Sequence, residues 1–441
     1  MNSAPSLPSL PSLPSFPFEA AEDDDFGRAG NLEPRHAVVS MPLWREAKFA
    51  RVYETLLGVG ITYGLTTSAL SIHLDRHGIA QTRMGILATV FALGIVLSSV
   101  AYAWIGKHVS PRSALTVSVV GYAICIGAFS QTSSFGAMLG IRGLDGAFSV
   151  VSWIAAETLL LREAPKARKA EVMSYYALSI ALGYVIGPLV GNAVLRLTGA
   201  TTPVFVLASA LALVSAVLSR RVRSNGSTES AATNDLATKL HGSGDPLEPE
   251  VLSMKALASR VRIPCLATFA YGYFQASLIL FLPLFLVRSR GISEANTILI
   301  TAFFAAGMLL FSNVFARAGD RRGHVRVMRI LVLVGGSMVF LFSSIHSFAL
   351  MGIAVFIAGA TLASLSPLSL AMLGHTVPGR HLSRANSLYN AAYAGGMLVG
   401  PVISGLLFQR WGGEAMLFQL TALWVVFFAS TWARSQQTRA R

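Results

Sequence analysis

Charged side chains are scarce in this chain. Only 13% of its 441 residues are Asp, Glu, Lys or Arg, whereas 53% are hydrophobic. Soluble globular domains carry about 25% charged residues. The shortage of charge therefore excludes a soluble protein of two or three domains and indicates an array of membrane helices.

Cysteine and metal-ligand clusters are also scarce. The two cysteines, Cys125 and Cys265, lie in apolar runs, so no disulfide framework is expected. No cluster of His, Cys and carboxylates has metal-ligand spacing, and neither a phosphate-binding glycine loop nor a Gly-x-Ser-x-Gly motif occurs. We therefore expect no metal site, no cofactor, no enzymatic activity and no self-contained ATP-driven pump.

Acidic residues are outnumbered by basic ones, giving a net charge of +14. A basic chain can indicate nucleic-acid binding, but these residues lie at the ends of apolar segments, so we expect no nucleic-acid partner. With a cytoplasmic N-terminus, six of the 35 Lys and Arg residues fall in outer loops, Arg142 falls inside a span, and the other 28 fall in cytoplasmic segments. The positive-inside rule then predicts that both termini are cytoplasmic. We expect the membrane to be a bacterial inner (plasma) membrane.

Long hydrophobic segments predict twelve membrane helices, since each span needs about 20 apolar residues. Eight segments have the length of one span and two have the length of two. The single segments are 55–72, 84–106, 172–195, 197–219, 263–287, 295–316, 385–409 and 415–433, and the double ones are 113–161 and 330–379. Turns are predicted at 131–134 and 345–347 within the double segments.

Two segments are too polar to form spans. Residues 1–45 begin with a Pro/Ser-rich repeat and an acidic patch, and they lack the basic region and apolar run of a signal peptide. We expect them to be a disordered cytoplasmic tail. A second disordered segment, over 222–260, is expected to link a six-helix bundle at 46–221 to another at 261–436.

A glycine–proline run occurs twice in the chain, with an offset of 213 residues. Such a run in an apolar helix allows close backbone approach and introduces a kink. The residues are Gly183, Gly187, Pro188 and Gly191 in the first copy, and Gly396, Gly400, Pro401 and Gly405 in the second. The duplication predicts two pseudo-symmetric six-helix units in an all-α membrane protein, an architecture typical of secondary transporters.

With these motifs, the chain resembles the major facilitator superfamily from about residue 45 to 436. The first glycine–proline run matches a helix-5 motif typical of the twelve-helix drug or metabolite:proton antiporters. Arg142-Gly143-Leu144-Asp145-Gly146 resembles a helix-4 motif, with Asp in place of Gln, whose arginine the family implicates in proton transfer. The resemblance assigns Asp320, Arg321, Gly323 and Arg326 to a loop motif that holds the cytoplasmic side shut by contacts near 170–173.

Ionisable groups inside spans are costly, so each is a candidate functional residue. Arg142 and Asp145 lie three residues apart on one helical face and are expected to pair, either as a proton-coupling site or as a permanent structural ion pair. Glu157 lies near the cytoplasmic end of the same span, where it is expected to reach the interface or pair with Arg162 or Lys166. Glu54, at the cytoplasmic end of the first span, is a candidate gate residue.

The family fold implies a central cavity lined by helices 1, 4, 7 and 10, with help from 5, 8 and 11. The candidate cavity residues are Tyr63, Thr66, Tyr271, Phe274, Gln275, Ser366, Asn386, Tyr389, Asn390 and Tyr393. Aromatic and amide groups with one arginine suit a moderately sized organic solute. For each residue, ordinary helix packing is the alternative.

These observations together predict a monomeric secondary transporter in a lipid bilayer that exports a small organic molecule in exchange for protons. Two alternatives stay open. One is a proton-coupled importer of a sugar, organic acid or amino-acid-like solute, and the other is a non-transporting membrane sensor or scaffold.

Overall fold

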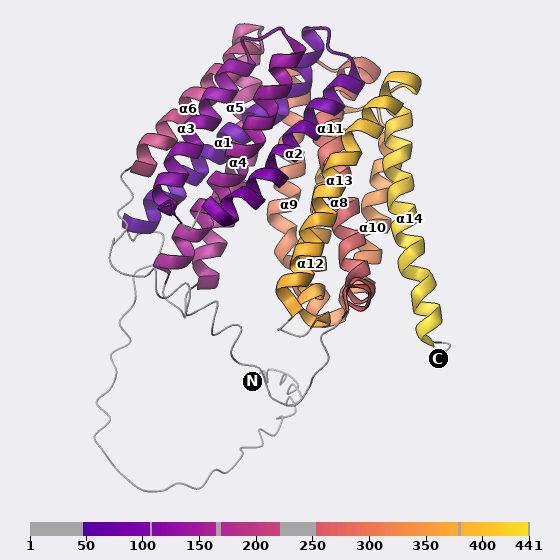
Figure 1. Cartoon of the computed structure of the whole chain (residues 1–441). Helices are drawn as coiled ribbons and strands as arrows, with labels where there is room; N and C mark the ends of the chain where they lie inside the picture. The colour runs from indigo at the N-terminus through magenta and orange to yellow at the C-terminus, as the bar shows by residue number, and fades with distance from the viewer. Residues whose placement is uncertain (1–46, 106–107, 165–168, 221–252, 378–380, 440–441) are drawn as a thin grey trace, which may run out of the picture. The chain divides into compact units, whose positions relative to one another are not determined.

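The computed structural model describes residues 47–105, 108–164, 169–220, 253–377 and 381–439, which form helices joined by short turns (Figure 1). In the first half the helices are α1 (Ala47–Arg76), α2 (Gln81–Ile105), α3 (Pro111–Phe129), α4 (Phe135–Glu163), α5 (Lys169–Thr198) and α6 (Thr202–Arg220). In the second half they are α8 (Met254–Arg290), α9 (Glu294–Arg322), α10 (His324–Phe342), α11 (Phe348–Leu362), α12 (Leu365–Thr376), α13 (Leu382–Trp411) and α14 (Gly413–Arg439).

Twelve membrane spans are present in the described part of the chain, which confirms the predicted number and the all-α fold. The predicted turns appear, at Ser130–Ser134 and Ser343–Ser347. Helices α11 and α12 together make one span, Phe348–Thr376. The predicted N-terminal tail lies outside the described residues, and so does the linker up to residue 252.

The end of the predicted linker differs from the structure, because α8 begins at Met254 rather than after residue 260. The Ser253 side chain caps this helix by accepting a hydrogen bond from the backbone N–H of Ala256, at 3.3 Å. Leu257 and Val261 are buried in a small apolar cluster that includes Tyr389 of α13. A cap and two buried contacts stabilise a helical turn that composition alone does not indicate.

The two halves repeat the same helix packing. In the first half α1 packs on α5 and α6, α4 packs on α2 and α3, and α3 packs on α6. The equivalent pairs α8 with α13 and α14, α11 with α9 and α10, and α10 with α14 occur in the second half. Between the halves, α2 packs on α13 and α9 packs on α5, so the interface also follows the repeat.

The repeated glycines lie where helices pack most closely. A Cβ atom at Gly187 of α5 would lie 2.6 Å from the carbonyl oxygen of Ile61 and 2.7 Å from the backbone of Gly64 in α1. In α13, a Cβ at Gly400 would lie 2.7 Å from the carbonyl oxygen of Tyr273 in α8. Only glycine allows backbones this close.

Large apolar side chains face outward on many helices, as expected of faces that meet lipid tails rather than water. They include Leu97, Val100, Val117, Ile124, Leu310, Val425 and Val426. The core between helices is dominated by buried aromatic and leucine side chains such as Phe205, Phe274, Phe281, Phe285 and Trp424.

One break distinguishes the halves. The span equivalent to α4 is interrupted between α11 and α12, at Ala363 and Ser364. Pro367 explains the break, because it has no N–H to donate to the carbonyl four residues earlier, which is that of Ala363. The equivalent position in α4 is Ile154, and that helix is continuous.

Candidate functional site

Each half contains a cavity at the equivalent place, and only one of them is charged. The first, with about 350 Å³ of partly open space, lies among α1, α2, α3, α4 and α6. The second, with about 290 Å³, lies among α8, α10, α11 and α14. Four lining residues of the first have their counterparts 213 residues later in the second: Ile126 and Val339, Phe129 and Phe342, Arg142 and Val355, Asp145 and Ala358.

Arg142 and Asp145 form the charged part of the first cavity. They pair directly, and their side chains are only 12% and 8% exposed. The Asp145 carboxylate also accepts a hydrogen bond from the Ser149 hydroxyl at 3.4 Å. The Arg142 guanidinium lies 4.3 Å from the centre of the Phe91 ring, and its Nε atom has no hydrogen-bond partner among the described residues.

This geometry makes the pair sensitive to any change in charge. A buried ion pair loses most of its hydration, so it is stable only while both partners are charged and bonded. The Phe91 ring contributes a cation–π contact but leaves Arg142 Nε unsatisfied. Neutralising either partner would leave the other as an uncompensated charge.

Glu157 and Glu54 have different surroundings. The Tyr176 hydroxyl of α5 donates a hydrogen bond to Glu157 Oε1 at 2.8 Å. This contact replaces the expected pairing with Arg162, and Lys166 lies outside the described residues. Glu54 is exposed near the start of α1, and no ion pair of its carboxylate is found within the described ranges.

Tyrosine side chains pack against other aromatic rings in both halves of the chain. In the first half Tyr63 packs against Tyr184 at a ring distance of 5.2 Å and against Trp153 at 5.6 Å. Its neighbour Thr66 donates to the backbone carbonyl of Thr62 and also lines the charged cavity.

In the second half, the Tyr393 hydroxyl donates to Gln275 Oε1 at 2.8 Å, and its ring stacks on Tyr271 at 6.1 Å. Tyr389 is buried and donates to the carbonyl of Ser366 at 2.9 Å. The structure thus brings these predicted cavity residues together as two groups, Tyr271 with Gln275 and Tyr393, and Ser366 with Tyr389.

The other cavity candidates of the second half are separate from these two groups. Asn386 and Asn390 are exposed, and Asn390 donates to the Asn386 carbonyl at 3.0 Å along its own helix. Phe274 is fully buried and packs on Phe304 and Trp424 inside the second bundle, beside the apolar cavity.

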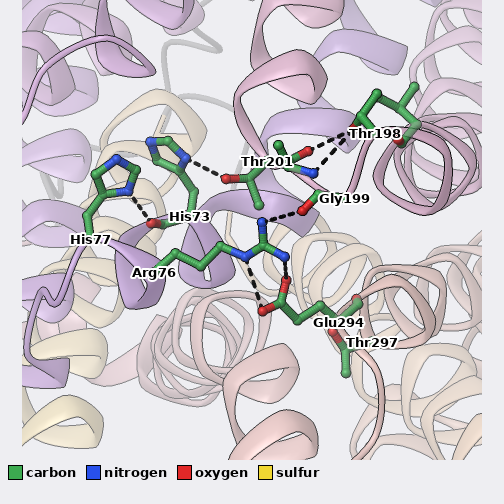
Figure 2. Close-up of polar contacts among 10 residues, drawn as sticks. His73, Arg76, His77, Thr198, Gly199, Thr201, Glu294 and Thr297 are labelled. Atoms are coloured by element: carbon green, nitrogen blue, oxygen red, sulfur yellow. Dashed lines mark hydrogen bonds and ion pairs between the residues drawn. The ribbon is translucent and has the colours of Figure 1, made fainter.

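Polar contacts between the halves gather at one end of the helices, which we call the bridged end. It comprises the ends of α1, α5, α8 and α13 and the starts of α2 and α9. Arg76 at the end of α1 binds Glu294 at the start of α9 through two nitrogens, at 2.6 and 3.1 Å, and donates to the Gly199 carbonyl at 2.8 Å (Figure 2).

The remaining contacts at the bridged end follow the repeat. Asp75 pairs with Arg288, which lies 213 residues later, so equivalent positions carry opposite charges and bind each other. Gln409 accepts from the backbone N–H of Thr82 at 3.2 Å, while Arg196, the counterpart of Gln409, donates to Asn296 at 2.5 Å. Bonds at equivalent or neighbouring positions of the repeat therefore hold the halves together at this end.

The loop motif lies at the opposite end of α9. Asp320 is 57% exposed, and its carboxylate lies 3.2 Å from His324 Nε2. Arg321, Gly323 and Arg326 are exposed. Of the residues expected to contact this motif near 170–173, the side chains of 170 and 171 lie outside the described residues.

Two groups of residues escaped prediction from the sequence. The bridging charges Asp75, Arg76, Arg288 and Glu294 lie at span ends, where charge is ordinary, and only the 213-residue offset between Asp75 and Arg288 signals a relation. His324 and His375 gather around Asp320. Only the spacing of four residues from Asp320 to His324 hints at this in the sequence.

Comparisons with known proteins agree with this architecture. The family model of the Major Facilitator Superfamily matches residues 55–262 and 264–439. Multidrug resistance protein 1 of Bacillus subtilis is 23% identical over 382 residues, covering 81% of this chain and 88% of that protein. An uncharacterized MFS-type transporter of Yersinia pestis is 22% identical over 378 residues, covering 84% and 92%.

Solved structures share the fold. A bacterial homologue of the human lysosomal transporter Spinster, in an inward-facing and occupied conformation, has a TM-score of 0.72 at 14% identity, covering 88% of this chain and 96% of that one. The nucleoside transporter NupG has a TM-score of 0.70 at 13% identity, covering 88% and 98%. At these identities the likeness concerns the fold alone.

Proposed function

Because the chain belongs to the Major Facilitator Superfamily and is therefore a membrane transporter, we propose that it exports a small organic molecule in exchange for protons. The observation that carries this proposal is the contrast between the two equivalent cavities. Equivalent positions of the two halves carry Arg142 and Asp145 in one cavity and Val355 and Ala358 in the other. A buried ion pair that packing does not require marks a functional site.

Asp145 is the proposed proton carrier. When its carboxylate takes up a proton, the attraction to Arg142 is lost and the guanidinium must find a new partner. Its unsatisfied Nε atom and the polar groups of Tyr63 and Thr66 lie at the same cavity. Protonation thus changes which groups Arg142 binds, and so links proton uptake to rearrangement of the first bundle.

The bridged end is the proposed outer gate. With both termini cytoplasmic by the positive-inside rule, this end faces away from the cytoplasm. The described conformation then has its outer gate closed by the Arg76–Glu294 and Asp75–Arg288 pairs. Alternating access requires these pairs to separate while the opposite end closes, where we propose that Asp320, Arg321, Gly323 and Arg326 act.

The proposed location is the inner membrane of a bacterium, since the relatives compared above are bacterial. A single chain carries both halves of a transport unit, so we propose that it works as a monomer. Similarity to a multidrug resistance protein favours an organic substrate and export over import. The aromatic cluster around Tyr271 and Tyr393 supports a substrate with apolar surface.

Everted membrane vesicles test the direction of transport. Vesicles with and without the protein are given an acidic lumen and a panel of fluorescent organic cations, anions and neutral molecules, with ethidium first. Export predicts that a panel member accumulates inside the everted vesicles and that collapse of the proton gradient releases it. Accumulation in right-side-out vesicles under an inward proton gradient would instead establish the importer.

A further inference from the structure

Three potential metal ligands meet at the end of the helices opposite the bridged end. Asp320 lies in the last turn of α9, His324 is the first residue of α10, and His375 lies in the last turn of α12. One ligand atom from each lies within 4.8 Å of the other two. The rings of the two histidines are 5.3 Å apart, centre to centre.

The backbone explains why the group forms. Gly323 separates α9 from α10 with φ of 87°, a conformation that side-chain-bearing residues rarely adopt. The chain therefore turns sharply between Asp320 and His324. His375 is brought to them by the packing of α12 against α9 and α10.

One nitrogen of His324 has no hydrogen-bond partner among the described residues. Its side chain is 14% exposed, and its Nε2 atom is buried without a hydrogen-bond partner among the described residues, although Asp320 Oδ1 is only 3.2 Å away. Buried polar atoms are nearly always bonded, so this nitrogen lacks a partner of its own. It lies beside an oxygen that a bound cation would share.

We propose that Asp320, His324 and His375 bind one divalent transition-metal ion of the zinc class. Two imidazoles and one carboxylate suit Zn²⁺, whereas Mg²⁺ and Ca²⁺ prefer oxygen ligands alone. Metal–ligand bonds of about 2.0–2.2 Å place tetrahedral ligand atoms about 3.3 Å apart, so the group needs to contract by roughly 1.5 Å at most. Asp320 and His375 are exposed and free to make this adjustment, and water completes the shell.

Some of the surrounding charges favour the binding of a cation and others oppose it. The C-terminal ends of α9 and α12 direct partial negative charge toward the site, whereas the N-terminal end of α10, at His324, directs partial positive charge toward it, so the three helix ends together favour a cation. Arg321, Arg322 and Arg326 on the same segment oppose it, but all three are exposed and their charge is screened. Direct coordination therefore outweighs the long-range repulsion.

A bound metal would also occupy Asp320. This consequence rests on the proposed gating role of the loop motif. With its carboxylate on the metal, Asp320 would be tied to α10 and α12 within the second half and unable to contact α5. The metal would thus hold this end of the transporter open.

Co²⁺ titration of the purified, tag-free chain tests the site, because tetrahedral Co²⁺ absorbs visible light and Zn²⁺ displaces it. We expect one Co²⁺ per chain, and at least roughly tenfold weaker binding in His324→Ala and in His375→Ala. His346→Ala, at an exposed histidine between α10 and α11, is the matched control and should bind normally. Thermal unfolding verifies that each variant is folded. Unchanged affinity in folded His375→Ala, or no binding by the unmodified chain, would overturn the site.

The gating consequence has its own readout. Spin labels near the start of α5 and the end of α9 report the distance between the two halves, measured by pulsed electron–electron double resonance. Zn²⁺ should favour the longer distances in the unmodified chain and have no effect in His375→Ala. Metal binding without a change in distance would leave the site standing and refute only the link to the gate.

Discussion

Transplanting the apolar residues of the second cavity into the first provides a sharp test of the ion pair. The variant Arg142→Val/Asp145→Ala copies Val355 and Ala358, which occupy the equivalent positions in the second half. Because the same packing accepts apolar residues there, we expect the double variant to fold. The two single variants should be much less stable.

The magnitudes follow from the burial of the pair. Its side chains are 12% and 8% exposed, so removing one partner leaves a buried charge and costs about 3–5 kcal/mol. Replacing both partners by apolar residues is often neutral or stabilising, by about 1–4 kcal/mol. The double variant should therefore be more stable than either single variant, with a coupling energy of at least about 6 kcal/mol.

This double-mutant cycle is measured by equilibrium unfolding in mixed micelles that contain increasing amounts of a denaturing detergent. The four free energies of unfolding give the coupling energy directly. Costs that simply add, so that the double variant is the least stable of the four, would refute the description of Arg142 and Asp145 as a mutually dependent buried pair.

Three further changes test other parts of the structure. Glu294→Gln removes a partly exposed ion pair worth roughly 1 kcal/mol or less. It should increase the population open at the bridged end by up to about fivefold, measured by spin-label distances. The control variant Glu414→Gln, whose partner lies in the same half, should leave this population unchanged. Gly187→Ala forces α1 and α5 apart and should lower the free energy of unfolding by about 1–3 kcal/mol. Gly140→Ala, whose added Cβ meets nothing within 4 Å, should be neutral. Equal effects of the two variants would contradict the close packing of α1 on α5. Tyr393→Phe removes the hydrogen bond to Gln275 and should lower the free energy of unfolding by about 1 kcal/mol in the same assay. An unchanged free energy of unfolding would show that this bond does not stabilise the fold.

The sequence was sufficient to predict features that depend on local patterns. Span length and hydropathy predict the twelve spans of the described residues, because a helix satisfies its backbone hydrogen bonds within itself. The three-residue spacing predicts the pairing of Arg142 with Asp145, since both lie on one helical face.

Features that depend on how distant helices pack could not be predicted in this way. Glu157 binds Tyr176 on the next helix rather than a nearby arginine. The four charges at the bridged end join across the two halves, and His375 meets Asp320 from 55 residues away along the chain. Hydropathy carries no information on such pairings, which only the fold determines.

The central claim is that the asymmetric charge pair couples proton flow to export. Its most direct test compares the unmodified chain with Arg142→Val/Asp145→Ala in everted vesicles, using the panel member that the unmodified chain accumulates best. The double variant should be present and folded in the membrane, and should equilibrate the probe without accumulating it under the proton gradient. Accumulation equal to that of the unmodified chain would contradict the account.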